Sequence, residues 1–336
     1  MASAPNTARC ICLFDPFSDD GSTHRWNPLG YVRLDPNHRN GDIVAIAATL
    51  YKEMSGENPF WPAMGRKTFV AACEYLFDEY VSKKGTAFET GLPTLGGVYR
   101  LLAGAHLKPG QSLQQYLVEL LNQPTLGSHA RTGLNNLVGL ASETFTSAIE
   151  TALAPLNIFS NPIVDAATSA NDFDLSKLRK TIQSIYVGVS PAKLIEAKGV
   201  LNLFFEQAIK LNGRELPEHN PELKYQCMFM LDEFTALGRV EIVPVAVGWV
   251  AGYGIRIVIV IQSIAQFESV YGADTARGLI TNLGVRIVFT PREQRDSIRL
   301  ATTVVRTVGI RWAMCAWTRT IVTATSSPSP PRCTRR

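Results

Sequence analysis

A short apolar segment that ends in two acids constrains the fold more than any other feature of this chain. Met228 to Leu231 (MFML) is too short for a stable isolated helix and is flanked by polar residues, so it predicts a strand buried on both faces. Asp232 and Glu233 follow directly. Acids at the carboxyl end of a buried parallel strand lie where open α/β sheets bind their ligands. The segment therefore predicts an α/β sheet with a ligand site at its edge.

The acid pair has the arrangement of a Walker B motif. In that interpretation Asp232 holds Mg²⁺ through its water shell and Glu233 orients or deprotonates the attacking water. A second interpretation is that the acids cap the following helix, and the pair alone does not separate the two. The next apolar run, Ile255 to Ile261, ends at Gln262, whose amide could sense a γ-phosphate. This amide favours the nucleotide site.

The order of the remaining segments predicts a mostly parallel sheet with an inserted all-α domain. From 184 to 290, strands and helices alternate as in βαβ units, with a last core strand at 285–289. The spacing from 42 to 121 is helical, a further helix is expected over 134–153, and a Pro/Asn-rich connection follows it. A first strand is expected at 10–14. Residues 1–41 and 156–296 are predicted to form the nucleotide-binding domain. Residues 42–155 are predicted to form the all-α domain, and residues 297–336 a tail.

Asp15 ends the first predicted strand and could face the same crevice as Asp232, although such a residue more often caps a turn. The phosphate-binding motif G-x-x-x-x-G-K-[ST] does not occur in the sequence. Gly65 to Thr68 has some of its letters but lies in a helical pattern. The acid pair thus has metal-binding potential but little to hold a triphosphate.

The net charge of +4 depends on the tail, because residues 297–336 hold seven Arg and no Lys, Asp or Glu. Without the tail the chain is mildly acidic, which excludes a global nucleic-acid footprint. The tail is either a basic arm for nucleic acid or, as we prefer, the product of an out-of-frame or aberrant end. No apolar run reaches the roughly 18 to 20 residues of a membrane span, and no secretory signal is present, so we expect a cytoplasmic chain.

The cysteines predict neither a disulfide framework nor a zinc site. The one close pair, Cys10 and Cys12, lies in the first predicted strand. Cys73 and Cys227 stand in apolar runs and are interpreted as small buried residues.

Several longer blocks carry a resemblance. At LDEFTALGRVEI, with IQS downstream, the chain resembles the TraG/VirD4 family of type IV secretion coupling proteins, the conjugative DNA-transfer ATPases. FDPFSDDGSTHRWNPL, APLNIFSNPIVDAATSANDFDL, IYVGVSP, LNLFFEQAI, RELPEHNPELKYQ and FTPREQRD look like family blocks in the family order. The likeness covers roughly residues 10–296.

This resemblance implies a RecA-like P-loop NTPase core interrupted by an all-α domain and assembled as a hexamer at the inner membrane. Such proteins use ATP and Mg²⁺ and bring relaxase-bound DNA or effector proteins to the secretion channel. By position, Asp232 and Glu233 would be the Walker B acids and Gln262 the phosphate-sensing residue. Arg292 and Arg295 would reach nucleotide across a subunit boundary. Family members carry membrane helices and a Walker A loop upstream of the block where this chain begins, so we expect a piece truncated at both ends.

Three functions follow as hypotheses. The first is a coupling-protein ATPase fragment that does not hydrolyse ATP alone. The second is a non-enzymatic module that binds secretion substrates or intact coupling-protein subunits. The third, ranked last, is a DNA-binding protein that uses the arginine tail, which predicts strongly salt-dependent binding. Sheet edges exposed by a missing first βα unit would favour aggregation.

Overall fold

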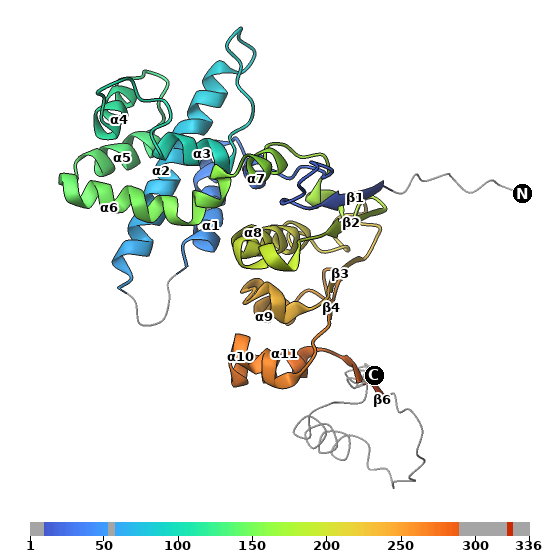
Figure 1. The fold of residues 1–336 in the computed structure, drawn as a ribbon. Helices are drawn as coiled ribbons and strands as arrows, with labels where there is room; N and C mark the ends of the chain where they lie inside the picture. Colours follow the sequence, from blue (N-terminus) through green and yellow to red (C-terminus); the bar gives the residue numbers. More distant parts are fainter. Residues whose placement is uncertain (1–9, 53–57, 289–320, 325–336) are drawn as a thin grey trace, which may run out of the picture. The chain divides into compact units, whose positions relative to one another are not determined.

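The structure, a computed structural model, describes residues 10–52, 58–288 and 321–324. The chain divides into two compact units, 1–225 and 226–336, which we call the first and second unit. Figure 1 shows the elements of each unit, and each is described by itself.

A parallel pair of strands far apart in sequence forms the sheet of the first unit. β1 (Cys10–Phe14) pairs with β2 (Gln183–Val187) over five residues. The first strand was predicted with these bounds; the second was predicted at 184–189, so it begins one residue earlier and ends two residues earlier than expected. Side chains alternate across β1, so Phe14 is buried while Leu13 is 43% exposed.

An aromatic cluster packs against the buried face of β1. The ring of Phe14 stacks on that of Phe204 with centroids 5.6 Å apart, and Trp26 meets Phe204 edge-on at 5.1 Å. Phe204 belongs to α8 (Leu194–Asn212), which is capped at its C-terminal end by Gly213. This cluster ties the strand, the loop after it and α8 into one core.

Helices make up the middle of the first unit, as the sequence predicts. Around α2 pack α1, α3, α5 and α6 (Figure 1). The predicted helical pattern around Gly65 to Thr68 is confirmed, because these residues lie inside α2. The bounds are α1 (Pro36–Leu50), α2 (Phe60–Lys83), α3 (Leu95–Leu102), α4 (Leu113–Leu121), α5 (Ser128–Val138), α6 (Ser142–Leu153) and α7 (Pro162–Ala167).

The single helix predicted over 134–153 is wrong. The structure has two helices, because α5 ends at the C-cap Gly139 and Ala141 is turned out of helical geometry with ψ 148°. The apolar spacing continues through this break, which is why the pattern predicts one element.

The connection after α6 is also more regular than its Pro/Asn content indicates. Pro155 and Pro162 each stand at the start of a short helix, a position that tolerates a residue without an N–H. Short 3₁₀ turns complete this unit: η1 (Pro28–Tyr31), η2 (Ala154–Ser160), η3 (Leu175–Lys177) and η4 (Pro191–Lys193).

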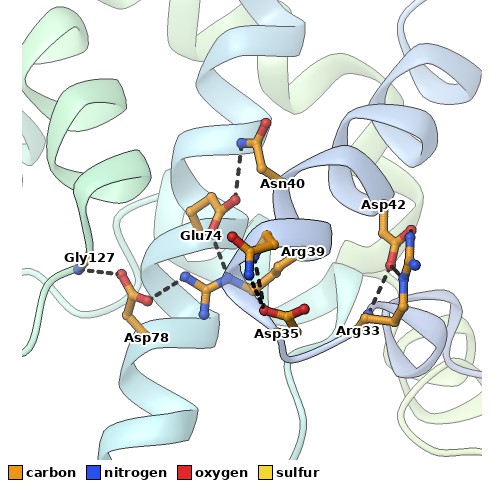
Figure 2. Close-up of polar contacts among 9 residues, drawn as sticks. Arg33, Asp35, Arg39, Asn40, Asp42, Glu74, Asp78 and Gly127 are labelled. Atoms are coloured by element: carbon orange, nitrogen blue, oxygen red, sulfur yellow. Dashed lines mark hydrogen bonds and ion pairs between the residues drawn. The ribbon is translucent and has the colours of Figure 1, made fainter.

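A buried ionic cluster joins three helices of the first unit (Figure 2). Arg39 of α1 donates from Nε to Glu74 Oε2 at 2.8 Å and from Nη2 to Asp78 Oδ1 at 2.6 Å. Both acids lie on α2, and their other oxygens accept from Asn40 and from the backbone N–H of Gly127, the N-cap of α5. The guanidinium and both carboxylates are therefore paired although they are nearly inaccessible to water.

An ion pair between two loops gives this unit a pH-dependent contribution to stability. Arg25 donates to Asp172 from its backbone N at 2.8 Å, from Nε at 3.1 Å and from Nη2 at 2.8 Å. The hydrogen bond from the Arg25 side chain lowers the pKa of Asp172 below its ordinary value of 3.8. Because the folded-state pKa is the lower one, the contribution is present above pH 3.8 and is lost as the pH falls through the folded-state pKa.

We therefore expect Asp172→Asn to destabilise the protein at about pH 7 and to destabilise it less near pH 3, below the ordinary pKa of the carboxyl, where part of the contribution is lost. Urea unfolding of wild type and variant at both pH values measures this difference. Arg25→Gln, which removes the partner, is the matched control and should show the same pH dependence. A loss of stability that is equal at both pH values would contradict the assignment.

The second unit contains a parallel strand pair and an antiparallel one. β3 (Cys227–Leu231) pairs in parallel with β4 (Ile255–Ile259), and β5 (Val285–Val288) pairs antiparallel with β6 (Ile321–Ala324). The helical segments are η5 (Phe234–Leu237), α9 (Ile242–Ala246), α10 (Ile264–Tyr271) and α11 (Ala273–Asn282).

Two expectations for the strands of this unit are corrected. β3 is not buried on both faces, since Met228 and Met230 are 62% and 65% exposed, and in β4 Val258 is 36% exposed. In a sheet with one exposed face, burial alternates along each strand. The sequence does not reveal this alternation here, because the side chains on the exposed face are apolar as well. The last predicted core strand pairs with β6 rather than extending the parallel sheet, and β6 lies in the predicted tail.

None of the helices in the described part of the chain combines the length and the apolar character that crossing a bilayer requires.

Candidate functional site

The paired strands β3 and β4 bring the predicted site residues to one edge of their sheet. Leu231 and Ile259 are partners in the parallel register, so both strands end at the same level. The pairing continues beyond them, because Val260 N donates to Leu231 O and Phe234 N donates to Val260 O, each at 3.0 Å. The acid pair therefore lies beside the residues that lead to Gln262.

The second acid and the amide are in contact. Gln262 Nε2 donates to Glu233 Oε1 at 3.3 Å, and Glu233 N donates to Asp232 Oδ1 at 3.0 Å. All three residues are exposed. The sequence predicts that they share one rim, and the structure brings them together there, with carboxylate and amide groups facing solvent.

The backbone at Glu233 is strained. Its φ of 44° and ψ of 45° place it in the left-handed region, and it is the only residue other than glycine with positive φ in the described ranges. Such a conformation costs of order 1–3 kcal/mol and persists where the surroundings impose it, often at functional sites. A glycine or asparagine would be the less strained choice at this turn.

Three buried aromatic rings hold the turn after the acids. Phe234 stacks on Tyr271 with centroids 5.3 Å apart, and Phe267 contacts both rings. The hydroxyl of Tyr271 accepts a hydrogen bond from Val240 N at 2.9 Å, and burial raises its pKa above the ordinary value. Sequence reasoning missed these supports, although the aromatic spacing along α10 gives a hint of them.

The start of α10 restricts the position of the Gln262 amide. Ser263, directly after Gln262, caps α10 by accepting a hydrogen bond from Gln266 N at 3.1 Å. Serine in this position is a common N-cap, so the end of β4 and the start of α10 are separated by a short, defined link. This link determines where the amide projects.

The side chains at this edge of the sheet suit the Mg²⁺-binding half of a nucleotide site. In the residues that the structure describes, no three His, Cys, Asp or Glu side chains converge on a metal position. Mg²⁺ nevertheless needs only one or two carboxylates when phosphates and waters supply the rest, so Asp232 with Glu233 fits it. The second unit offers little to bind the nucleotide phosphates. No lysine follows Lys224 in the sequence, and Arg239 of the second unit is already paired with Glu241.

Other predicted residues lie apart from this site or outside the described ranges. Asp15 accepts a hydrogen bond from Phe17 N at 3.0 Å, which agrees with its alternative as a turn residue. Arg292 and Arg295 fall outside the described residues. Cys73 and Cys227 are buried as predicted.

A cavity of about 220 Å³ in the first unit contains none of the predicted site residues. Most of its lining is apolar, including Trp26 and Phe159, and its one carboxylate, Glu196, is ion-paired with Lys193 at the surface. We assign it no chemistry.

The fold is that of bacterial conjugative coupling proteins. Solved structures of the plasmid coupling protein TrwB superimpose on this chain with TM-scores of 0.59, for its complex with a GTP analogue, and 0.56, for its complex with ADP and Mg²⁺. The identity is 14% in both, and the matches cover 88% and 83% of this chain and 62% and 58% of the TrwB chains.

The family model for type IV secretory system conjugative DNA transfer matches residues 5–305. The chain belongs to this family. It is 29% identical over 279 residues to the protein VirD4 of Rhizobium rhizogenes, covering 82% of this chain and 39% of that protein. It is 25% identical over 309 residues to the conjugal transfer protein TraG of Escherichia coli, covering 87% and 46%. The chain thus spans less than half of these curated relatives.

Proposed function

We propose that this chain acts in conjugative DNA transfer as part of the nucleotide-binding region of a coupling protein. The observation that carries the proposal is the contact between Glu233 and Gln262 at the common edge of β3 and β4, with Asp232 adjacent. Family membership supports it, and so does the complex of the similar fold of TrwB with ADP and Mg²⁺.

Each side chain has a defined role in this proposal. Asp232 would hold Mg²⁺, which would supply charge neutralisation for the nucleotide phosphates. Glu233 would orient the attacking water, and Gln262, which donates a hydrogen bond to Glu233, would sense the γ-phosphate. Arg292 and Arg295 lie outside the described residues, and their proposed role, to reach the nucleotide across a subunit boundary, rests on the family resemblance alone.

The cellular role follows from the family. We propose that the chain takes part in delivering relaxase-bound DNA or effector proteins to the secretion channel, at the cytoplasmic side of the inner membrane and in a hexameric assembly. A RecA-like core with an inserted all-α domain at 42–155 is the corresponding domain organisation.

Metal-dependent nucleotide binding tests the site. We expect full-chain protein to bind a fluorescent ATP analogue at high concentration in a Mg²⁺-dependent manner, and Asp232→Asn to weaken that binding by roughly tenfold. Asp274→Asn is the matched control, because Asp274 is fully exposed on α11 of the same unit. Equal affinities for both variants, or binding that is indifferent to Mg²⁺, would overturn the assignment.

Turnover is a separate question. Because the motif G-x-x-x-x-G-K-[ST] is missing from the sequence, we expect phosphate release from ATP to stay at the background rate. Turnover that Glu233→Gln abolishes would show instead that the chain hydrolyses ATP by itself.

A second candidate function, a non-enzymatic interaction module, is favoured by the exposed apolar faces of both parallel strand pairs. Ile11 and Tyr186 are 67% and 62% exposed in the first unit, and Met230 is 65% exposed in the second. Such faces are normally covered in parallel sheets. Co-expression with a full-length coupling protein and a pull-down tests this function, and Met230→Asp should reduce the recovered complex.

A further inference from the structure

Two cysteines of β1 lie with their sulfur atoms in non-bonded contact. Cys10 and Cys12 are two residues apart in the strand, so their side chains project from the same face. The Sγ atoms are 3.3 Å apart. None of the sequence blocks or site residues of the proposed function depends on this pair, so it is independent of the nucleotide site.

The two thiols differ in access to solvent. Cys10 is exposed, whereas Cys12 is 1% exposed. Burial, and then the hydrogen bond with Cys10, raise the pKa of Cys12 to about 11, and the charge of Asp172 acts in the same direction. Cys12 is therefore a neutral thiol at physiological pH, and Cys10 is the sulfur that meets a reagent from solution.

The geometry permits a bond after a small local movement. A strand rise of about 3.3 Å per residue puts the two Cα atoms about 6.6 Å apart, near the upper end of the usual range for disulfides. The sulfurs must approach by a little over 1 Å to reach the S–S length of about 2.05 Å. Cys10 is the first residue of β1 and forms the outermost pair with Gln183, so bending there disturbs one end of the strand pair.

We propose that Cys10 and Cys12 form a reversible disulfide within β1, with a small-molecule disulfide such as oxidised glutathione as the oxidant. The Cys10 thiolate attacks the glutathione disulfide, forms a mixed disulfide and releases one glutathione thiolate. Cys12 then loses its proton and attacks the Cys10 sulfur, which releases the second glutathione thiolate. Two protein thiols are oxidised and one glutathione disulfide is reduced to two thiols.

The other described cysteines do not compete for this reaction. Cys73 lies inside α2 and Cys227 at the start of β3, and both are buried. An exposed thiol with a second thiol beside it forms an intramolecular disulfide in preference to a lasting mixed disulfide, because the resolving group is held at high effective concentration.

Thiol trapping of the full chain tests the proposal. The protein is equilibrated with oxidised and reduced glutathione at a series of ratios, trapped with N-ethylmaleimide in a denaturing buffer so that both thiols are accessible, and cleaved with trypsin. Cleavage after Arg9 and Arg25 gives a peptide, 10–25, that holds both cysteines and no other. We expect both maleimide labels to fall roughly tenfold together as the ratio becomes oxidising, and the unlabelled peptide to be lighter by two hydrogens.

Two variants separate the steps. Cys12→Ser should accumulate the Cys10–glutathione mixed disulfide, because nothing resolves it. Cys10→Ser should leave Cys12 reduced, because Cys12 is buried. A wild-type chain that ends as the Cys10–glutathione adduct, or as a dimer linked through Cys10, with Cys12 still labelled, would overturn the proposal. The wild-type result decides even if a variant fails to fold.

Discussion

Arg39→Ala is expected to lower the free energy of unfolding of the first unit by about 3–5 kcal/mol. The guanidinium of Arg39 is the only cation bonded to Glu74 and Asp78 in the cluster of Figure 2, and all three side chains are at most 9% exposed. Removing it leaves two carboxylates close together in a poorly hydrated site, so that at least one must take up a proton or the helices must separate. The expected loss in the free energy of unfolding therefore comes from buried charges left unpaired, and not from a single lost contact.

Chemical denaturation followed by circular dichroism measures this effect, with Arg33→Ala as the matched control. Arg33 also pairs with an aspartate, Asp42, at 2.8 Å, but its side chain is 48% exposed (Figure 2). Its removal should cost less than about 1 kcal/mol. Adding Glu74→Gln and Asp78→Asn to Arg39→Ala should recover part of the loss. Equal costs for the two arginine variants would show that the buried cluster contributes no more than a surface ion pair.

Trp26→Ala is the second change with a large expected effect, a loss of about 3–5 kcal/mol. Trp26 is fully buried and meets Phe14 and Phe204 edge-on, at 5.6 and 5.1 Å between centroids. Truncation removes the largest ring of the core between β1 and α8 and leaves a cavity that the stacked phenylalanines cannot fill. The apolar surface lost and the cavity both act against folding.

Circular dichroism is again the suitable probe, since the substitution removes a fluorophore. Phe88→Ala is the control: Phe88 is 78% exposed, and its loss should change stability by no more than about 0.5 kcal/mol. Trp26→Phe should fall between the two, because it keeps most of the buried area and removes an indole N–H that has no hydrogen-bond partner. A Trp26→Ala protein as stable as the Phe88→Ala protein would show that this cluster is not the core.

The site could be predicted from the sequence largely because strand ends and polar residues coincide in it. Apolar runs ended at Asp232 and at Gln262, and parallel pairing brings such ends together. The strain at Glu233 could not be predicted, because it depends on the turn that the buried ring of Phe234 imposes. Long-range packing, not local propensity, fixes that turn.

The elements with a clear hydrophobic periodicity were predicted from the sequence. The side chains that are buried by residues far away in the chain were not. The helical spacing of α1 to α4 and the strand β1 are confirmed. Met228 misled the interpretation because an exposed and a buried methionine look the same in a sequence. Arg39 was missed for the converse reason: a charged residue in a helix normally faces water, and only the meeting of α1 with α2 makes it a core residue.

The parallel register of β3 with β4 fixes the spacing between the acid pair and the amide. Their separation is set by counting peptide units from one matched pair, Leu231 and Ile259, to each functional group. Inserting a single residue within β4 would offset the two by about 3.3 Å and invert the faces of the strand beyond it. The length of the connection between the strands, at 238–254, does not enter this spacing, although the connection itself contains α9 and the buried Val240 and Val243.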